Sequence, residues 1–448
     1  MKVMPMRAAT PTGNRGSIAI IGLLFFVFGF VTWLNGSLIP VLRIICQLST
    51  SQALLVTFVF YAAYTVMALP AAAILRRIGY RTGMALGMAI MALGALLHIP
   101  AAYLAAFPFF LLALFVIGSG LTILQTASNP YIVLLGPAES AARRISIMGI
   151  INKSAGVLAP LAFAALIPNV GNGDPAPQGR INAAMAHSLA NGLVRPYLGM
   201  AALLLLLAAL LRAAPLPEID VDGTKEEVEP SSIWRFPHLV LGAITLFFYM
   251  GLEVMAGDTI GLFGQSLGMV DFVSLTSYTM GFMVLGYAIG ALVVPRLLSQ
   301  RKALALSGFA GLASIAGISM TLPESHALSE IVLGWTGLSA IPDPVFCVAL
   351  MGLSNALVWP TVWPLALDGL GKLSSTGSAL LVMAISGGAV IPQIFGWIAA
   401  DMHDMQAAYL LGAPCYGIVL LYAIFGSRMR SWSVDLESLP PVFAKLQK

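Results

Sequence analysis

The sequence predicts an all-α membrane protein in which twelve transmembrane helices form two six-helix lobes. Hydrophobic residues make up 59% of the 448 residues and charged residues only 9%, against about 25% charged residues in soluble domains. Apolar windows of roughly 20 residues, long enough to cross the hydrocarbon layer, recur along the whole chain. Short motifs in the first half reappear in the second half, which is typical of two repeated lobes.

Each predicted span is an apolar run bounded by charged or by Gly- and Pro-rich segments. The expected spans are 17–42, 53–75, 83–104, 108–133, 145–168, 195–213, 237–262, 272–296, 303–322, 345–368, 377–400 and 406–427. The first 16 residues have no short apolar core followed by a small-residue cleavage site. The first span is therefore expected to stay in the mature protein.

Five segments follow from these spans. They are a cytoplasmic tail (1–16), an N-terminal lobe (17–213), a cytoplasmic linker (214–236), a C-terminal lobe (237–427) and a cytoplasmic tail (428–448). The linker is expected because an acidic run from Glu218 to Glu229, flanked by prolines, cannot cross lipid. A second polar stretch, Asn169–Pro196, is expected to form an outer loop between spans five and six.

The basic residues predict the orientation, because lysine and arginine favour the cytoplasmic face. Nearly all of the 23 Lys and Arg residues fall on the side of the N-terminus, with Arg43, Arg180 and Arg195 outside and Lys153 within a span. Both termini are therefore expected in the cytoplasm. The net charge of +4 reflects this topology, and no basic cluster interleaved with aromatic residues indicates nucleic-acid binding.

The two halves share motifs in the same order. Leu24-Phe25-Phe26-x-x-Gly29 recurs 222 residues later from Leu246 to Gly251. Gly156-Val157-Leu158-Ala159-Pro160 recurs 232 residues later as Gly388-Ala389-Val390-Ile391-Pro392. Span one therefore corresponds to span seven, and span five to span eleven.

The sequence carries no signature of an enzyme, a metal site or a cofactor. The motifs of serine hydrolases, zinc proteases and phosphate-binding loops are absent, and the five histidines are scattered toward loops and span ends. Cys46, Cys347 and Cys415 lack paired or metal-like spacing and are expected to be packing residues.

The loop from Arg76 to Arg81, which follows span two and contains Arg-x-Gly, resembles the cytoplasmic signature of the major facilitator superfamily. Arg76 replaces the usual aspartate before that core. The resemblance implies the major facilitator fold, in which two lobes rock around a site at the membrane midplane.

Four longer stretches resemble the fucose:proton symporter family, and more closely its bacterial glucose/galactose transporter branch. They are Phe25–Pro40, Leu124–Pro137, Arg144–Pro160 and Trp363–Pro392. Symporting members of that family carry a carboxylate after the asparagine in span one and another in span four, where this sequence has Gly36 and Gln125. Neither side chain carries a proton, so the resemblance implies the class of substrate more strongly than proton coupling.

The polar residues of the spans suit a neutral sugar, because amides match pairs of hydroxyls and indole rings match the C–H faces of the ring. Intramembrane amides also bond helix to helix, which is the competing interpretation. The expected substrate-binding residues are Asn35, Gln125, Asn129, Asn152, Lys153, Asn355, Trp359 and Gln393.

Three ionisable residues are candidates for coupling to an ion: Glu253, Asp258 and Lys153. Charges in the bilayer are costly, so Lys153 and Glu253 are each expected to face a partner or a wet cavity. Lys153 is expected to bond Asn152, Gln125 or sugar oxygens, and a pairing with Glu253 across the lobes is a second option. Asp258 matches Gly36 through the repeat and is expected near the outer, solvated end of span seven.

The expected function is inward transport of a hexose, glucose or galactose or both, across the bacterial plasma membrane by a monomer embedded in the bilayer. Coupling to protons through Glu253, coupling to sodium and uncoupled transport all remain open, and the residues at positions 36 and 125 favour the uncoupled form. Two other functions are an amphipathic-drug exporter of the same fold and a transporter-like sugar sensor. The amide inventory and the short tails argue against both.

Overall fold

A computed structural model describes residues 15–134, 141–166, 183–213, 230–294, 297–370 and 373–432. These ranges are helical, and no strand occurs within them. They contain 12 stretches of helix long and apolar enough to cross a membrane. The predicted all-α fold with twelve spans is therefore confirmed, whereas the cytoplasmic placement of the termini stays a prediction.

The first six spans are formed by long helices. They are α1 (Arg15–Ile45), α2 (Thr50–Ala53) continuing into α3 (Leu55–Ile78), α4 (Tyr80–Leu104), α5 (Phe107–Leu134), α6 (Ala141–Leu166) and α7 (Ala183–Ala213). A single residue, Gly79, separates α3 from α4. Its φ of 78° lies in the left-handed region that favours glycine, so the Arg-x-Gly loop forms an abrupt reversal.

The last six spans contain more breaks. The elements are η3 (Pro230–Arg235), α8 (Pro237–Ser266), η4 (Phe272–Ser274), α9 (Leu275–Val293), α10 (Gln300–Met320), α11 (Ala327–Leu333), η5 (Gly334–Thr336), α12 (Asp343–Asn355), α13 (Val358–Leu367), α14 (Ser374–Met383), η7 (Ala384–Ser386), α15 (Gly387–Met402), α16 (Met405–Ala408), η8 (Tyr409–Leu411), α17 (Gly412–Ile424) and η9 (Gly426–Arg428). Predicted span ten is thus α12 and α13, span eleven is α14 to α15, and span twelve is α16 to α17.

The described part of one expected loop is helical. The stretch Asn169–Pro196 was expected to lie outside the spans, but α7 begins at Ala183 and Pro196 lies inside it. The run of Ala, Leu and Met residues around Ser188 is apolar enough to extend the span to that residue. Proline is tolerated within a membrane helix because neighbouring groups satisfy the freed carbonyl.

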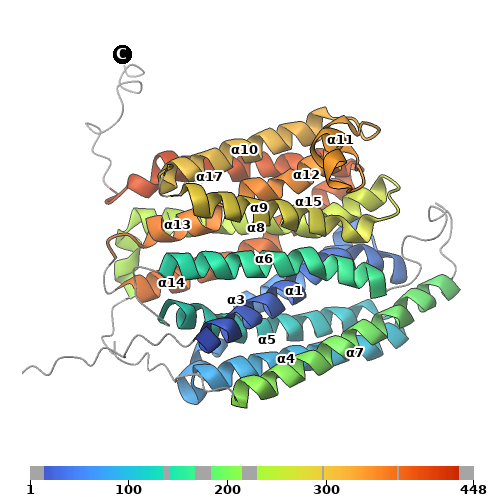
Figure 1. Ribbon diagram of the computed structural model, residues 1–448, viewed down its shortest axis with the longest axis horizontal. Helices are drawn as coiled ribbons and strands as arrows, with labels where there is room; N and C mark the ends of the chain where they lie inside the picture. Colours follow the sequence, from blue (N-terminus) through green and yellow to red (C-terminus); the bar gives the residue numbers. More distant parts are fainter. Residues whose placement is uncertain are drawn as a thin grey trace, which may run out of the picture.

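The helices form two lobes that meet along a seam (Figure 1). In the N-terminal lobe α4 packs against α5 and α7, and α1 packs against α6. In the C-terminal lobe α10 packs against α12 and α17, and α8 packs against α15. Across the seam α1, α6 and α3 contact α8, α9 and α15 respectively. Groups on these six helices can therefore contact both lobes.

Glycines allow the closest helix contacts. A Cβ atom on Gly387, the first residue of α15, would lie 1.7 Å from the Phe247 carbonyl oxygen of α8. The obstructing atom belongs to the backbone, so it cannot rotate away. By contrast, a Cβ on Gly281 of α9 would meet no atom within 4 Å.

We expect Gly387→Ala to lower the stability of the purified protein by about 1–3 kcal/mol, because α8 and α15 must move apart to admit the methyl group. The matched control is Gly281→Ala, which adds the same methyl group in open space on a helix and should leave stability unchanged or slightly higher. Thermal unfolding in detergent measures both. Equal melting temperatures for the two variants would contradict the packing described here.

Candidate functional site

A buried ion pair joins the two lobes. Lys153 of α6 pairs through its Nζ with Oε1 of Glu253 on α8, and the hydroxyl of Tyr249, one turn earlier on α8, donates to Oε2. Lys153 is 7% exposed and Glu253 is 3% exposed. Both residues lie near the middle of their helices, where an unpaired charge is costly. Each charge therefore has its partner in the other lobe.

The pairing settles which of two expected contacts Lys153 makes. Its ammonium bonds Glu253, not Asn152 or Gln125, and lies 4.3 Å from the centre of the Trp33 ring, a cation–π contact. Asn152 instead donates through Nδ2 to the Phe25 carbonyl oxygen of α1, 3.3 Å away. This bond stays within the N-terminal lobe.

The Trp33 indole ring is packed between the lobes. A Cβ atom on Gly156 of α6 would lie 2.7 Å from its Cδ1, and one on Gly257 of α8 would lie 2.5 Å from its Cζ3. Met280 and Tyr287 of α9 complete the apolar cluster around it. Glycines on both sides leave room only for the ring, so Trp33 holds the seam and supports the Lys153 ammonium.

Gln125 lies near the seam on α5. Its Nε2 donates to the hydroxyl of Tyr64 on α3 at 2.8 Å, and its side chain is half-buried. The Tyr64 ring stacks on that of Tyr61, with 5.8 Å between the ring centres. Gln125 is therefore oriented by a bond to a neighbouring helix while part of its side chain stays accessible.

Two buried asparagines each keep a free amide group. Asn35 on α1 and Asn355 at the end of α12 have Nδ2 atoms with no partner among the described residues. Oδ1 of Asn355 accepts a bond of 2.9 Å from the Tyr416 hydroxyl, and Tyr416 interacts electrostatically with Glu253. Buried donors without partners are uncommon, so these two amides have capacity for a ligand or a water molecule.

Two other residues expected to contact the substrate, Trp359 and Gln393, lie in different parts of the seam. Trp359 on α13 lies beside the ion pair, because its ring centre is 6.4 Å from that of Tyr249. Gln393 on α15 donates to the carbonyl and hydroxyl oxygens of Ser51 at 3.2 and 3.1 Å, and lines a pocket of about 270 Å³ at the seam with α2. None of its described contacts reaches the ion pair. The side chain of Asn129 lies outside the described part of the structure.

Asp258 does not lie in the solvated place expected for it. It is 1% exposed, and α8 continues for two further turns to Ser266. Its Oδ2 accepts a 2.7 Å bond from the hydroxyl of Thr57 on α3, whereas Oδ1 has no partner among the described residues. The expectation was wrong because packing against α3 covers this part of α8.

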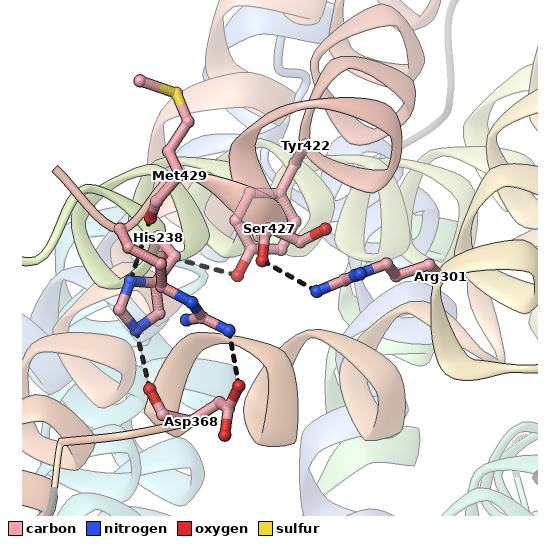
Figure 2. Close-up of polar contacts among 7 residues, drawn as sticks. His238, Arg301, Asp368, Tyr422, Ser427 and Met429 are labelled. Atoms are coloured by element: carbon pink, nitrogen blue, oxygen red, sulfur yellow. Dashed lines mark hydrogen bonds and ion pairs between the residues drawn. The ribbon is translucent and has the colours of Figure 1, made fainter. Parts of the chain in front are cut away.

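A second polar group lies at the other end of the C-terminal lobe (Figure 2). The ring nitrogens of His238, near the start of α8, lie 3.2 and 2.9 Å from the carbonyl oxygens of Met429 and Asp368. Arg430 pairs with the Asp368 carboxylate, and the Tyr422 hydroxyl donates to the His238 carbonyl oxygen at 3.0 Å. These bonds connect α8 with the ends of α13 and α17. We therefore assign this group a structural role.

Sequence reasoning missed the two hydroxyl residues that hold the acidic groups. Tyr249 could have been found, because a residue four positions before Glu253 lies on the same helix face. Thr57 had no such signal, because it approaches Asp258 from a helix 201 positions away in sequence.

We expect Lys153→Met and Glu253→Gln each to destabilise the protein by about 3–5 kcal/mol, because each leaves a buried group without its partner. The double variant should recover much of that loss. Arg430→Met is the matched control, since its pair with Asp368 has side chains 46% and 64% exposed and such pairs contribute at most about 1 kcal/mol. Thermal unfolding in detergent tests the set, and a Lys153→Met protein that melts like the wild type would contradict the pairing.

Comparison with known proteins agrees with this architecture. The family model described as Major Facilitator Superfamily matches residues 21–392. The glucose/galactose transporter of Brucella abortus biovar 1 (strain 9-941) is 34% identical over 432 residues, which cover 95% of this chain and 98% of that protein. The L-fucose-proton symporter of Escherichia coli (strain K12) is 26% identical over 92% of this chain and 93% of its own length.

The fold also matches a solved transporter. The crystal structure of FucP in the outward conformation aligns with a TM-score of 0.68 at 24% identity, covering 92% of this chain and 99% of that one. The proteins matched here are transporters and not enzymes. The chain is a multi-pass membrane transporter that belongs to the Major Facilitator Superfamily, in the branch that holds the bacterial glucose/galactose transporters and L-fucose-proton symporters.

Proposed function

We propose that this protein carries a hexose, glucose or galactose or both, across the bacterial inner membrane as a monomer, by alternating access of its two lobes. The names of its relatives support the class of substrate. The observation that carries the proposal is the polar centre of the seam. The helices at this seam and beside it carry the buried ion pair, the Trp359 ring beside Tyr249, the half-buried Gln125 amide, and two buried asparagines whose Nδ2 atoms have no partner among the described residues.

The proposed sugar site lies around the Lys153–Glu253 pair. Gln125, Asn152 and Asn35 contribute from the N-terminal lobe, and Trp359 and Asn355 from the C-terminal lobe. A sugar hydroxyl both donates and accepts, so an amide that keeps a free group can bond it without losing its contact to the protein. Trp359 offers the apolar face that the C–H groups of a pyranose require. In this proposal Gln393 belongs to the seam with α2.

The contacts at one end of the seam support alternating access. Where α1 and α8 end, the Ser37 hydroxyl donates to the Val273 carbonyl oxygen at 2.7 Å, and Arg43 donates to Gln265 at 3.3 Å. If the N-terminus is cytoplasmic, this end faces outward, and the lobes are closed there. FucP has been solved in the outward conformation. The contacts at this end therefore differ from what an outward opening between the lobes would require.

Uptake of labelled glucose into proteoliposomes that hold the purified protein tests this proposal. We expect saturable uptake that unlabelled galactose competes with and lipophilic cations do not. Competition by the cations alone would indicate an exporter, and sugar binding without uptake would indicate a sensor. Uptake of neither hexose would overturn the proposal.

We expect Gln125→Leu to raise the KM for glucose about 5- to 150-fold, because it removes a hydrogen bond in a buried site, a loss of about 1–3 kcal/mol. Gln300→Leu is the matched control, since Gln300 is the first residue of α10 and lies outside the seam. Its KM should equal that of the wild type. Equal KM values for the two variants would remove Gln125 from the sugar site.

A further inference from the structure

We propose that Asp258 is the group that binds a proton during transport, and that its burial against Thr57 requires the proton. This inference rests on the proposed hexose transport for its place in the cycle. It assigns proton binding to a residue of α8, because Gly36 and Gln125 cannot bind a proton. Transport would then be coupled to protons, whereas the sequence favours the uncoupled form.

The geometry of Glu253 argues against that residue. Both of its carboxylate oxygens accept bonds, one from Lys153 and one from Tyr249. A proton on Glu253 would remove the charge that Lys153 pairs with and leave a buried ammonium uncompensated, which is strongly unfavourable. Neither oxygen of Glu253 can take up a proton without disrupting its bond to Lys153 or Tyr249.

Asp258 has the opposite surroundings. It is 1% exposed, it accepts one bond from Thr57, and its Oδ1 has no described partner. An ionised carboxylate without a cation and with a single hydrogen bond cannot be buried at reasonable cost. A neutral carboxylic acid can, because it carries no charge and its one unpartnered oxygen costs much less than a buried anion.

The groups that face Asp258 supply no compensating charge. Tyr61, one turn along α3 from Thr57, interacts with it electrostatically, and Tyr409 of η8 bonds the adjacent Thr259. Arg43 of α1 bonds Gln265, two turns further along α8, and Glu253 is engaged with Lys153. Within the described part of the chain, Asp258 forms no ion pair.

The repeat explains why the acid is on α8. Position 36 corresponds to position 258, and a Cβ on Gly36 would lie 2.6 Å from the Gly257 carbonyl oxygen and 2.4 Å from the Thr276 hydroxyl. A larger side chain at position 36 would therefore not fit between α1 and α8 as they pack here. At position 258 the acid faces α3, where Thr57 receives it.

This arrangement links protonation to the transport cycle. The bond between Thr57 and Asp258 joins the lobes, so it breaks when they separate and exposes the carboxyl group to water. Loss of the proton then favours the separated state, and binding of a proton favours closure. Since the closed end is the outer one in the predicted orientation, a proton taken up from the outside accompanies closure. Coupling then requires that Asp258 lose this proton to water from the inner side before the outer end reopens.

The test measures closure without sugar. Spin labels on cysteines introduced at Gln52 and Met402, which are exposed residues at this end of the two lobes, report the distance between the lobes in a background that lacks the three native cysteines. We expect the short-distance population to rise as pH falls. Asp258→Asn, which resembles the neutral acid, should have a larger closed population than the wild type at neutral pH, and this population should not change with pH. Thr57→Val should lower the closed population.

The matched control is Asp271→Asn, which removes an exposed carboxylate at the same end of the C-terminal lobe and should keep the pH dependence. A wild type whose distances do not change with pH would overturn the proposal. So would an Asp258→Asn protein that keeps the pH dependence, or closure that follows sodium instead of protons.

A second measurement places Asp258 in transport. An inward gradient of one pH unit can drive accumulation of glucose up to about tenfold in proteoliposomes. Asp258→Asn should only equilibrate glucose while still exchanging it across the membrane. Accumulation by this variant would overturn the proposal. Absence of hexose uptake in the wild type, with pH-dependent closure that needs Asp258, would instead overturn the proposed substrate and keep the proton site.

Discussion

The pairing of Lys153 with Glu253 is the constraint around which the centre of the molecule is arranged. Two charges in the hydrocarbon layer must neutralise each other, and here they do so across the boundary between the lobes. Trp33 supports the ammonium, Tyr249 holds the second carboxylate oxygen, and Gly156 on α6 and Gly257 on α8 leave room for the Trp33 ring. No amide side chain is then needed to balance either charge.

Much of this could be predicted from the sequence, because a membrane simplifies the physics. Spans follow from apolar length, and Lys153 and Glu253 were identifiable because charges within spans are rare. Their contact was an open option, since spacing gives no distance between helices 100 residues apart. Asp258 was placed wrongly, because its burial depends on α3. The start of α7 was missed because its first turns mix polar and apolar residues.

The tryptophan and amide residues predicted the position of the site less well than the charged residues did. The Trp33 ring is buried by contacts from both lobes, so no substrate can reach it. The Trp359 ring, by contrast, keeps part of its surface accessible. Gln393 and Gln125 are the same residue type on seam helices, yet one bonds Ser51 near an end of the bundle and the other bonds Tyr64 beside the centre. Composition identifies which residues are available, and only packing decides which of them a substrate can reach.

The breaks in the C-terminal lobe have a mechanical consequence. Spans ten, eleven and twelve are interrupted at residues 356–357, in η7 and in η8, whereas α4, α5 and α6 run without interruption through the described residues. Breaks of this kind concentrate bending at a few peptide units. The C-terminal lobe can therefore bend at these joints, one of which lies at the start of the seam helix α15, whereas α4, α5 and α6 offer no such joint.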